Sequence, residues 1–574
     1  MADVGYRENY QKWINSPYVD EKTKAELLSV ANNEDELKMR FLAPMEFGTA
    51  GQRGIMGAGL ARLNVYTVKY TTKALASLVI REGKEAMEKG VVIAYDCRLN
   101  SREFGFEAAA VLASNGIKVY IFNELTPTPV LSYAIRRLGA TAGINITASH
   151  NPVEYNGYKV YWSNGAQLPP DEAAVVAAEL KKLDIFTDCI SRPAEELIES
   201  GMITVLDNGL EREFCNELLV RRINRDATEK TELSVVYTPL HGAGRRAVPY
   251  ILDALSVKYQ AVPEQMIPDG NFPTAPSPNP ENPAAFNLAL EVAKKEGNKA
   301  DLLIATDPDA DRIGVMAKKN GEYKVISGNQ MGVLLLNYMI EAKKARGELL
   351  KKSGAISTIV STPLAEKIAR KNGLEFASTF TGFKFIAEKI DEWQGKVDFL
   401  FGFEESFGYM IGDYVRDKDS VGAAMMVSEA AAYYKSQGKT LFDVLDSIYN
   451  EYGCYFEKTD NIMMKGIDGP EKTRRLMSEL RGEITELGGI KIEKTADFKS
   501  GIVTELETGK TEPTNMESSN VLKFFLKDGS AVCVRPSGTE PKVKVYYLVC
   551  GNDEAECILK TEKLSNAING IIAD

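Results

Sequence analysis

Histidine is scarce in this sequence, where only His150 and His241 occur among 574 residues. A metal site built from several imidazoles, such as the paired histidines of H-E-x-x-H, is therefore effectively excluded. Acid–base chemistry is then expected mainly from lysine, aspartate, glutamate or tyrosine.

Cysteine is also sparse, with seven widely spaced residues that form no C-x-x-C pair. An odd number at such spacing argues against a disulfide framework and against a zinc site. We expect reduced, mostly buried thiols.

Long apolar runs are missing as well. The longest, such as Met331–Leu336 and Gly422–Val427, are far shorter than the ~18 residues that span a bilayer. The N-terminus is polar from its third residue and shows no secretory signal, so we expect a cytoplasmic protein without a membrane partner. A net charge of −11 with no long Lys/Arg block argues against nucleic acid as a partner.

The chain alternates short β-rich apolar runs with helical patterns, which predicts an α/β fold. At roughly 100–200 residues per domain, its length predicts about three to five domains. Three similar α/β units each end a strand, at 142–146, 301–305 and 398–401, in a polar loop. Open α/β sheets bind ligands at such strand ends. A helical N-terminal extension (about 6–40) precedes the units, and an α+β tail follows Gly453.

The first unit illustrates the alternation. A strand is predicted over 91–95 and a helix over Ser101–Asn115, with Ser101 as its N-cap. The strand over 142–146 closes the unit.

Ser149 lies in the segment Thr-Ala-Ser-His-Asn-Pro that follows this strand. A hydroxyl at a strand end, with His150 beside it and Lys159 further along, can act as a nucleophile or carry a phosphoryl group. A plain turn is the alternative, because Ser, Asn and Pro are common turn residues. No G-x-S-x-G elbow surrounds the serine, which argues against a hydrolase of that kind.

Asp307, Asp309 and Asp311 follow the second strand at alternating positions. This spacing lets three carboxylates converge from one loop on Mg²⁺ or a similar hard cation. An EF-hand would need Gly and Glu where this chain has Arg312 and Lys318. A solvated acidic turn is the remaining alternative.

Two further segments carry groups suited to a sugar phosphate. The run Arg-Pro-Ser-Gly-Thr-Glu-Pro at 535–541 combines a guanidinium, two hydroxyls and a glycine, which predicts either a phosphate cradle or a plain turn. Glu404 and Ser406, after the third strand, offer a carboxylate and a hydroxyl to sugar hydroxyls.

Three cations stand in loop or glycine-rich contexts, namely Arg53, Lys384 and Lys418. Each alone is typical of a surface charge. Together they supply the local positive field that an acidic protein needs to bind a phosphorylated substrate.

With these motifs in this order, the chain resembles the α-D-phosphohexomutase superfamily, which contains phosphoglucomutases and phosphomannomutases. The four signatures are TASHNP (147–152), DPDADR (307–312), FEES (403–406) and RPSGTEPK (535–542). The similarity extends to FGTAGQRG (47–54), YDCR (95–98) and DGNFPTAPSPNPE (269–281). These variants are most similar to the branch with bacterial α-phosphoglucomutases and eukaryotic phosphopentomutases.

The resemblance implies three mixed α/β domains and a C-terminal α+β domain around a central cleft, with one motif loop each. We therefore expect a phosphoserine-loop domain with the N-terminal extension (1–205), a metal-loop domain (206–325), a sugar-loop domain (326–453) and a phosphate-binding domain (454–574).

The resemblance also implies a role for each motif residue. Metal binding is implied for Ser149, Asp307, Asp309 and Asp311, catalysis for Ser149, His150, Lys159 and Lys418, and substrate binding for Arg53, Arg312, Gly382, Lys384, Glu404, Ser406, Arg535, Ser537, Gly538 and Thr539. The two lysines would transfer protons, and His150 would assist them or support its loop.

The implied activity is that of a Mg²⁺-dependent phosphoglucomutase. Phosphorylated Ser149 would convert glucose 1-phosphate and glucose 6-phosphate into one another through glucose 1,6-bisphosphate. Phosphomannomutase and phosphopentomutase use the same mechanism and stay open, as does a metal-dependent sugar phosphatase. One departure concerns Gly408, where another branch of the family has a histidine that reads the sugar; Lys418 is the expected substitute.

Overall fold

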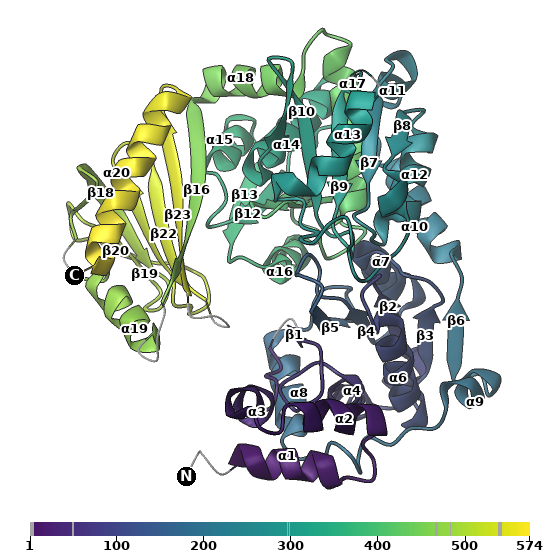
Figure 1. The fold of residues 1–574 in the computed structure, drawn as a ribbon. Helices are drawn as coiled ribbons and strands as arrows, with labels where there is room; N and C mark the ends of the chain where they lie inside the picture. The colour runs from purple at the N-terminus through teal and green to yellow at the C-terminus, as the bar shows by residue number, and fades with distance from the viewer. Residues whose placement is uncertain are drawn as a thin grey trace.

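Four β-sheets organise the chain in the computed structural model, among the residues that it describes. These residues are 5–48, 51–295, 297, 299–464, 469–482, 484–537 and 542–573. Figure 1 shows the first three sheets with their helices following one another through one body, while the C-terminal sheet stands to one side of it. The α/β fold with a C-terminal α+β part is confirmed.

The N-terminal extension is helical, as predicted. Its helices are α1 (Gly5–Asn15), α2 (Glu21–Ser29) and α3 (Glu34–Phe41). The buried indole of Trp13 meets the rings of Phe41, Tyr66 and Phe186 edge-on at centroid distances of 5.3–5.9 Å. These contacts dock the extension on the first α/β unit.

The first sheet has the strand order β1-β5-β4-β2-β3-β6, in which β4, β2, β3 and β6 run parallel. Its elements are β1 (Gln52–Ile55), α4 (Val65–Arg81), α5 (Lys84–Lys89), β2 (Val91–Tyr95), α6 (Ser101–Ser114), β3 (Val119–Phe122), α7 (Thr128–Leu138), β4 (Ala142–Ile146), β5 (Tyr155–Trp162), α8 (Pro170–Leu180), α9 (Ala194–Glu199) and β6 (Ile203–Leu206). The predicted N-cap of α6 is wrong, because Asn100 takes that position and Ser101 Oγ donates to Asp96 Oδ1 instead (2.8 Å).

The second sheet has the order β11-β10-β9-β7-β8. Its elements are α10 (Gly209–Val220), α11 (Arg225–Lys230), β7 (Ser234–Thr238), α12 (Gly244–Ala254), β8 (Lys258–Ala261), η1 (Pro263–Met266), η2 (Pro283–Phe286), α13 (Asn287–Lys295), β9 (Leu302–Thr306), β10 (Ile313–Lys319) and β11 (Glu322–Ile326).

The third sheet has the order β13-β12-β14-β15. Its elements are α14 (Gly328–Ala345), β12 (Ser353–Thr358), α15 (Leu364–Lys371), β13 (Glu375–Thr379), α16 (Phe383–Trp393), β14 (Asp398–Glu404), β15 (Gly408–Ile411), α17 (Ser420–Lys435) and α18 (Leu441–Tyr452). Helix α17 is buried over almost its whole length. It packs against α11 and α12 of the second unit, so the second and third units share one core.

One arrangement recurs in all three units. The last strand of the parallel set pairs with the following strand in antiparallel fashion, as β4 with β5, β9 with β10 and β14 with β15. Each motif loop is the connection of such a pair. Because the three sheets place these connections toward one another, three distant loops can form one site.

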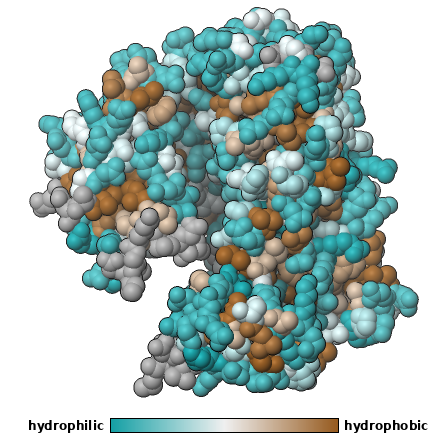
Figure 2. Space-filling model, viewed as in Figure 1, coloured by the Kyte–Doolittle hydropathy of each residue, from teal (hydrophilic) through white to brown (hydrophobic). Residues whose placement is uncertain are grey.

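The C-terminal sheet is antiparallel, in the order β16-β23-β22-β21-β18-β19-β20, with β17 paired to β18. Its elements are β16 (Cys454–Met463), α19 (Gly469–Glu479), β17 (Glu486–Leu487), β18 (Ile490–Asp497), β19 (Ile502–Glu505), β20 (Thr511–Pro513), β21 (Leu522–Leu526), β22 (Ala531–Pro536), β23 (Lys542–Gly551) and α20 (Glu554–Ala573). Figure 2 shows the surface hollowed between this part and the rest of the molecule.

Two of the predicted domain boundaries fall just inside a strand. Leu206 of β6 still pairs with Phe122 of the first sheet, and Ile326 of β11 still pairs with Val315 of the second. No helix within the described ranges is long and apolar enough to cross a lipid bilayer.

Candidate active site

Ser149 lies in the loop between β4 and β5, with its backbone in the left-handed region (φ 53°). Its amide donates to Thr147 Oγ1 (2.8 Å), which in turn donates to Asp96 Oδ2 (2.6 Å). Its hydroxyl donates to Asp307 Oδ2 (2.7 Å) and lies 3.1 Å from His150 Nδ1. The serine is thus a buried hydroxyl held against a carboxylate from another sheet.

The three aspartates of the second motif loop form a compact buried cluster. One oxygen from each of Asp307, Asp309 and Asp311 lies within 4.8 Å of the others. Asp307 Oδ1 accepts hydrogen bonds from the amides of Asp311 (3.1 Å) and Arg312 (3.0 Å). Asp309 Oδ1 and Asp311 Oδ1 are buried without a hydrogen-bond partner. Unpaired buried carboxylate oxygens are costly, so the cluster fits a hard divalent cation, and the acidic-turn alternative is disfavoured.

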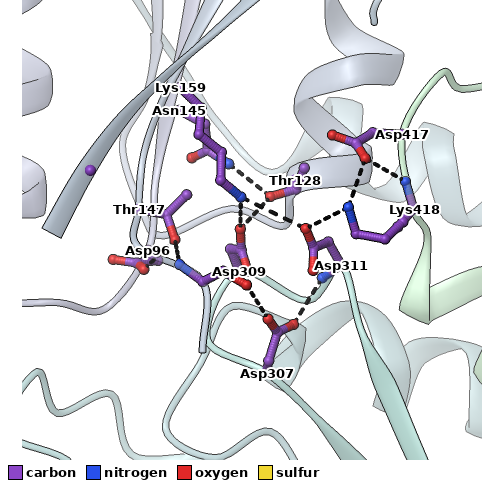
Figure 3. Close-up of polar contacts among 12 residues, drawn as sticks. Asp96, Thr128, Asn145, Thr147, Lys159, Asp307, Asp309, Asp311, Asp417 and Lys418 are labelled. Carbon is purple, nitrogen blue, oxygen red and sulfur yellow. Dashed lines mark hydrogen bonds and ion pairs between the residues drawn. The ribbon is translucent and has the colours of Figure 1, made fainter. Parts of the chain in front are cut away.

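Two lysines contact the triad from two sides (Figure 3). Lys159 Nζ on β5 donates to Asp309 Oδ2 (2.7 Å), and Lys418 Nζ lies 3.2 Å from Asp311 Oδ2. Lys418 also contacts Asp417 Oδ1 at 3.2 Å. Both side-chain nitrogens are therefore held by carboxylates of the triad.

The charges of this cluster shift several pKa values. Burial and the neighbouring Asp309 and Asp311 raise the pKa of Asp307 well above its usual range. For Asp311, burial raises the pKa, but the nearby Lys418, Lys159 and Arg312 outweigh it and lower the pKa overall. For Lys418, burial lowers the pKa, but Asp311, Asp417 and Glu404 raise it overall. Lys418 is therefore an ammonium group in this state.

Gly408 makes room for the Lys418 side chain. A Cβ at this position would lie 2.1 Å from Lys418 Cδ and 2.7 Å from its Cγ. The position where a family branch has a histidine is thus occupied here by the stem of Lys418. The functional substitution of Lys418 for that histidine stays a prediction.

Hydrogen bonds join residues of the first unit to the metal loop of the second unit and to Asp417 of the third. Thr128 Oγ1, which accepts from Asn145, donates to Asp309 Oδ2 (3.0 Å). Tyr161 OH (2.9 Å) and Gln167 Nε2 (3.2 Å) donate to Asp417 Oδ2.

Several predicted substrate residues have polar partners in the structure. Glu404 Oε1 accepts the amide of Gly382 (2.6 Å), and Arg53 donates to Asn151 Oδ1 (3.0 Å). Arg312 pairs with Glu281, and Arg535 of the C-terminal sheet reaches Thr381 of the third unit.

The remaining predicted substrate residues lie on helix α16 and in two loops, or outside the described residues. Lys384 follows Gly382 on the first turn of α16, and burial lowers its pKa. Ser406 lies in the tight turn between β14 and β15. The amide of Ser537 donates to Lys542 O (2.8 Å), while Gly538 and Thr539 lie outside the described residues.

The two histidines differ in their surroundings. Burial and the guanidinium groups of Arg312 and Arg53 hold the pKa of His150 well below its usual range, so its imidazole is neutral beside Ser149. His241 is buried, and its ring nitrogens lie 2.8 Å from Ile267 O and from Thr274 Oγ1. These bonds give His241 a structural role.

Sequence reasoning missed Arg98, Thr128 and Asp417, each of which contacts a predicted site residue. A signal existed for Arg98, because it follows β2, the strand that neighbours β4 in the sheet. Side chains after adjacent parallel strands meet at one sheet edge. For Thr128 and Asp417 we find no comparable signal.

The fold and the buried serine–aspartate–lysine site define the class as a phosphohexomutase, an isomerase. Profiles of phosphoglucomutase/phosphomannomutase α/β/α domains I, II and III match residues 44–185, 212–321 and 327–452, and that of the C-terminal domain matches 490–560. The chain belongs to the phosphoglucomutase/phosphomannomutase family.

Individual relatives agree with this assignment. A phosphoglucomutase of Staphylococcus aureus (strain USA300) is 37% identical over 525 residues, which cover 90% of this chain and 92% of the relative. Two solved structures share the fold. A phosphomannomutase described as putative, from Thermus thermophilus, has a TM-score of 0.67 at 21% identity and covers 93% of this chain and 100% of its own. Parafusin, a Paramecium phosphoglucomutase in an open form, has a TM-score of 0.66 at 18% sequence identity. The match covers 92% of this chain and 95% of parafusin.

Proposed function

We propose that this protein interconverts α-D-glucose 1-phosphate and glucose 6-phosphate through phosphorylated Ser149 and a glucose 1,6-bisphosphate intermediate. The observation that carries the proposal is the buried contact of Ser149 Oγ with Asp307 (2.7 Å), inside a carboxylate triad flanked by two lysines. The 37% identity to a phosphoglucomutase over 90% of the chain supports glucose as the sugar.

Mg²⁺ is the cation that we propose for Asp307, Asp309 and Asp311, together with the Ser149 oxygen. The buried Oδ1 atoms of Asp309 and Asp311, which have no hydrogen-bond partner, support this assignment. When bound, the cation supplies positive charge that stabilises the transferring phosphoryl group.

The lysines transfer the protons in this proposal. Lys418 is held as an ammonium group by Asp311 and Asp417, so it would donate its proton to the sugar oxygen that is released when a phosphoryl group moves from the bisphosphate to Ser149. In the opposite half-reaction the same nitrogen accepts the proton, as microscopic reversibility requires. Lys159, which is bound to Asp309, would accept and return the proton of Ser149 in the same two half-reactions.

The other residues bind the two ends of the sugar phosphate. Glu404 and Ser406 take sugar hydroxyls, while the phosphate that does not react is held by Lys384, Gly382 and the loop from Arg535 through Ser537 to Gly538 and Thr539. Arg53 and Arg312 add positive charge next to Ser149. A charged cradle at each end lets the bisphosphate rebind end for end, so that the second phosphoryl group returns to Ser149.

A coupled assay with Mg²⁺ and glucose 1,6-bisphosphate tests the proposal. It compares the 1-phosphates of glucose, mannose, glucosamine and ribose, and we expect the highest kcat/KM for glucose. A higher kcat/KM for mannose 1-phosphate or ribose 1-phosphate would overturn glucose as the substrate but would leave the proposed mechanism in place. Release of inorganic phosphate in place of an isomer would identify a phosphatase.

The Ser149→Ala variant tests the mechanism itself. We expect it to lose isomerase activity and to take up no label from radiolabelled bisphosphate. Isomerisation at the wild-type rate would refute the phosphoserine.

A further inference from the structure

A loop of the second unit, residues 267–282, reaches across to the first unit near Ser149. Its Gly270 lies so close to the chain after β2 that a Cβ there would meet Leu99 N at 2.4 Å and Cys97 O at 2.8 Å. Two residues later the buried ring of Phe272 covers the guanidinium of Arg98, with 5.1 Å between its centroid and Cζ. The loop therefore packs directly on Arg98.

Arg98 in turn donates hydrogen bonds to the backbone of the Ser149 loop. Its side chain is fully buried, and Nη2 donates to Ser149 O (2.6 Å) and to Asn151 O. Nη1 donates to the carbonyl oxygens of Pro152 (2.8 Å) and Tyr155 (2.9 Å). One planar guanidinium thus binds four carbonyl groups spread along the chain from Ser149 to Tyr155, a geometry that lysine cannot reproduce.

Ser149 needs such support, because its φ of 53° is unfavourable for a residue with a Cβ. A left-handed residue keeps this conformation only where its surroundings determine it. The bond from Arg98 to the serine's own carbonyl holds the backbone on one side, and Thr147 Oγ1 accepts the serine's amide on the other.

The loop that carries Phe272 is itself anchored to the second sheet by His241. Its two ring nitrogens bind Ile267 O and Thr274 Oγ1, one on each side of Phe272, and the two rings meet edge-on at 6.3 Å. The anchoring residue belongs to the loop 239–243, where Ala243 N also donates to Pro308 O of the metal loop (2.8 Å). The segment 239–243 therefore contacts both the metal loop and the loop whose Phe272 packs on Arg98.

We propose that Phe272 and Arg98 are a pair of positioning residues, which hold Ser149 in the orientation for phosphoryl transfer when the second unit is packed on the first. Phe272 shields the guanidinium from water, and this strengthens its bonds to the loop carbonyls. The inference rests on the proposed function, because it assumes that Ser149 carries the phosphoryl group.

Phe272→Leu tests the pair, and Phe106→Leu on α6 is the control, since Phe106 also lies against an arginine, Arg102 (4.5 Å), but this arginine is exposed to solvent. Single-turnover transfer from labelled phosphoserine to glucose 1-phosphate measures the step itself. We expect Phe272→Leu to slow transfer by at least about tenfold with KM unchanged, because small displacements of reacting groups cost large factors in rate. The control should transfer at the wild-type rate.

A double-mutant cycle shows whether Phe272 acts through Arg98. In an Arg98→Lys background, Phe272→Leu should cause no further loss of rate. Gly270→Ala, which pushes the loop away at the backbone, provides a second arm if the lysine variant does not fold, and it should also lower kcat with KM unchanged.

Intact mass of the wild-type protein separates the two proposals. If Ser149 never carries a phosphoryl group, the proposed function fails and this inference fails with it. If Ser149 is phosphorylated and Phe272→Leu transfers as fast as Phe106→Leu, only the positioning role is refuted.

Discussion

The Gly408→Ala variant, which adds one methyl group, should inactivate the enzyme by displacing the side chain of Lys418. The new Cβ would stand 2.1 Å from Lys418 Cδ, whereas carbon atoms pack at roughly 3.5–4 Å, so the lysine stem must move by about 1.5 Å. The stem cannot yield freely, because its Nζ is bound to Asp311 and Asp417 at 3.2 Å each. The backbone of Gly408 is outside the left-handed region, so alanine causes no backbone strain there.

The expected size of the effect follows from this displacement. Misplacing a catalytic group by about 1 Å costs roughly 100-fold in rate, and loss of a general acid or base costs about 100-fold to 10,000-fold. We therefore expect Gly408→Ala to lower kcat by about 100-fold with little change in KM. Overpacking costs about 1–3 kcal/mol in stability, which leaves a large protein folded.

The assay is steady-state isomerisation of glucose 1-phosphate by four proteins: wild type, Gly408→Ala, Lys418→Ala and the double variant. If the methyl group acts by displacing Lys418, it should cost nothing further once that side chain is removed. Wild-type activity of Gly408→Ala would refute the reasoning. So would an equal loss from Gly408→Ala in both backgrounds.

Three further outcomes are expected. Asp309→Asn removes one charge and alters a carboxylate whose Oδ1 has no partner, so half-maximal activity should require more Mg²⁺, as a metal titration would show. Asp417→Asn weakens the anchor of Lys418 and removes a carboxylate that raises its pKa, so kcat should fall by about tenfold and the alkaline limb of the pH–rate profile should move to lower pH. Burial raises the pKa of Glu457 from 4.5 to about 7, so the folded state holds this proton more tightly than the unfolded chain. Wild type should lose stability as pH rises from about 4.5 to 7, and the Tm of Glu457→Gln should fall less over that range.

Local sequence patterns were enough for many of the elements. The strands over 91–95 and 142–146 match β2 and β4, because parallel strands buried on both faces read as short continuous apolar runs. The cap of α6 was predicted wrongly, since Ser101 binds Asp96 in the site and Asn100 takes the left-handed cap position. Here a competing bond to a carboxylate only five residues earlier overrides the capping preference of the serine.

The four motif loops were recognisable because each carries a distinctive set of side chains on a few adjacent residues. Their chemistry follows from residue type, since three alternating aspartates suit a hard cation wherever they lie in a fold. The composition alone also showed that histidine is scarce and that no closely spaced cysteine pair occurs. These properties excluded a zinc enzyme and indicated one that works with serine, carboxylates and lysines.

Only the tertiary structure decided which groups meet. Ser149 contacts Asp307, Tyr161 contacts Asp417 and Phe272 covers Arg98, and each pair comes from two different sheets. The space that Gly408 leaves for Lys418 was likewise invisible in the sequence. Short-range preferences determine strands and turns, whereas the packing of sheets determines the distances on which charge, hydrogen bonding and catalysis depend.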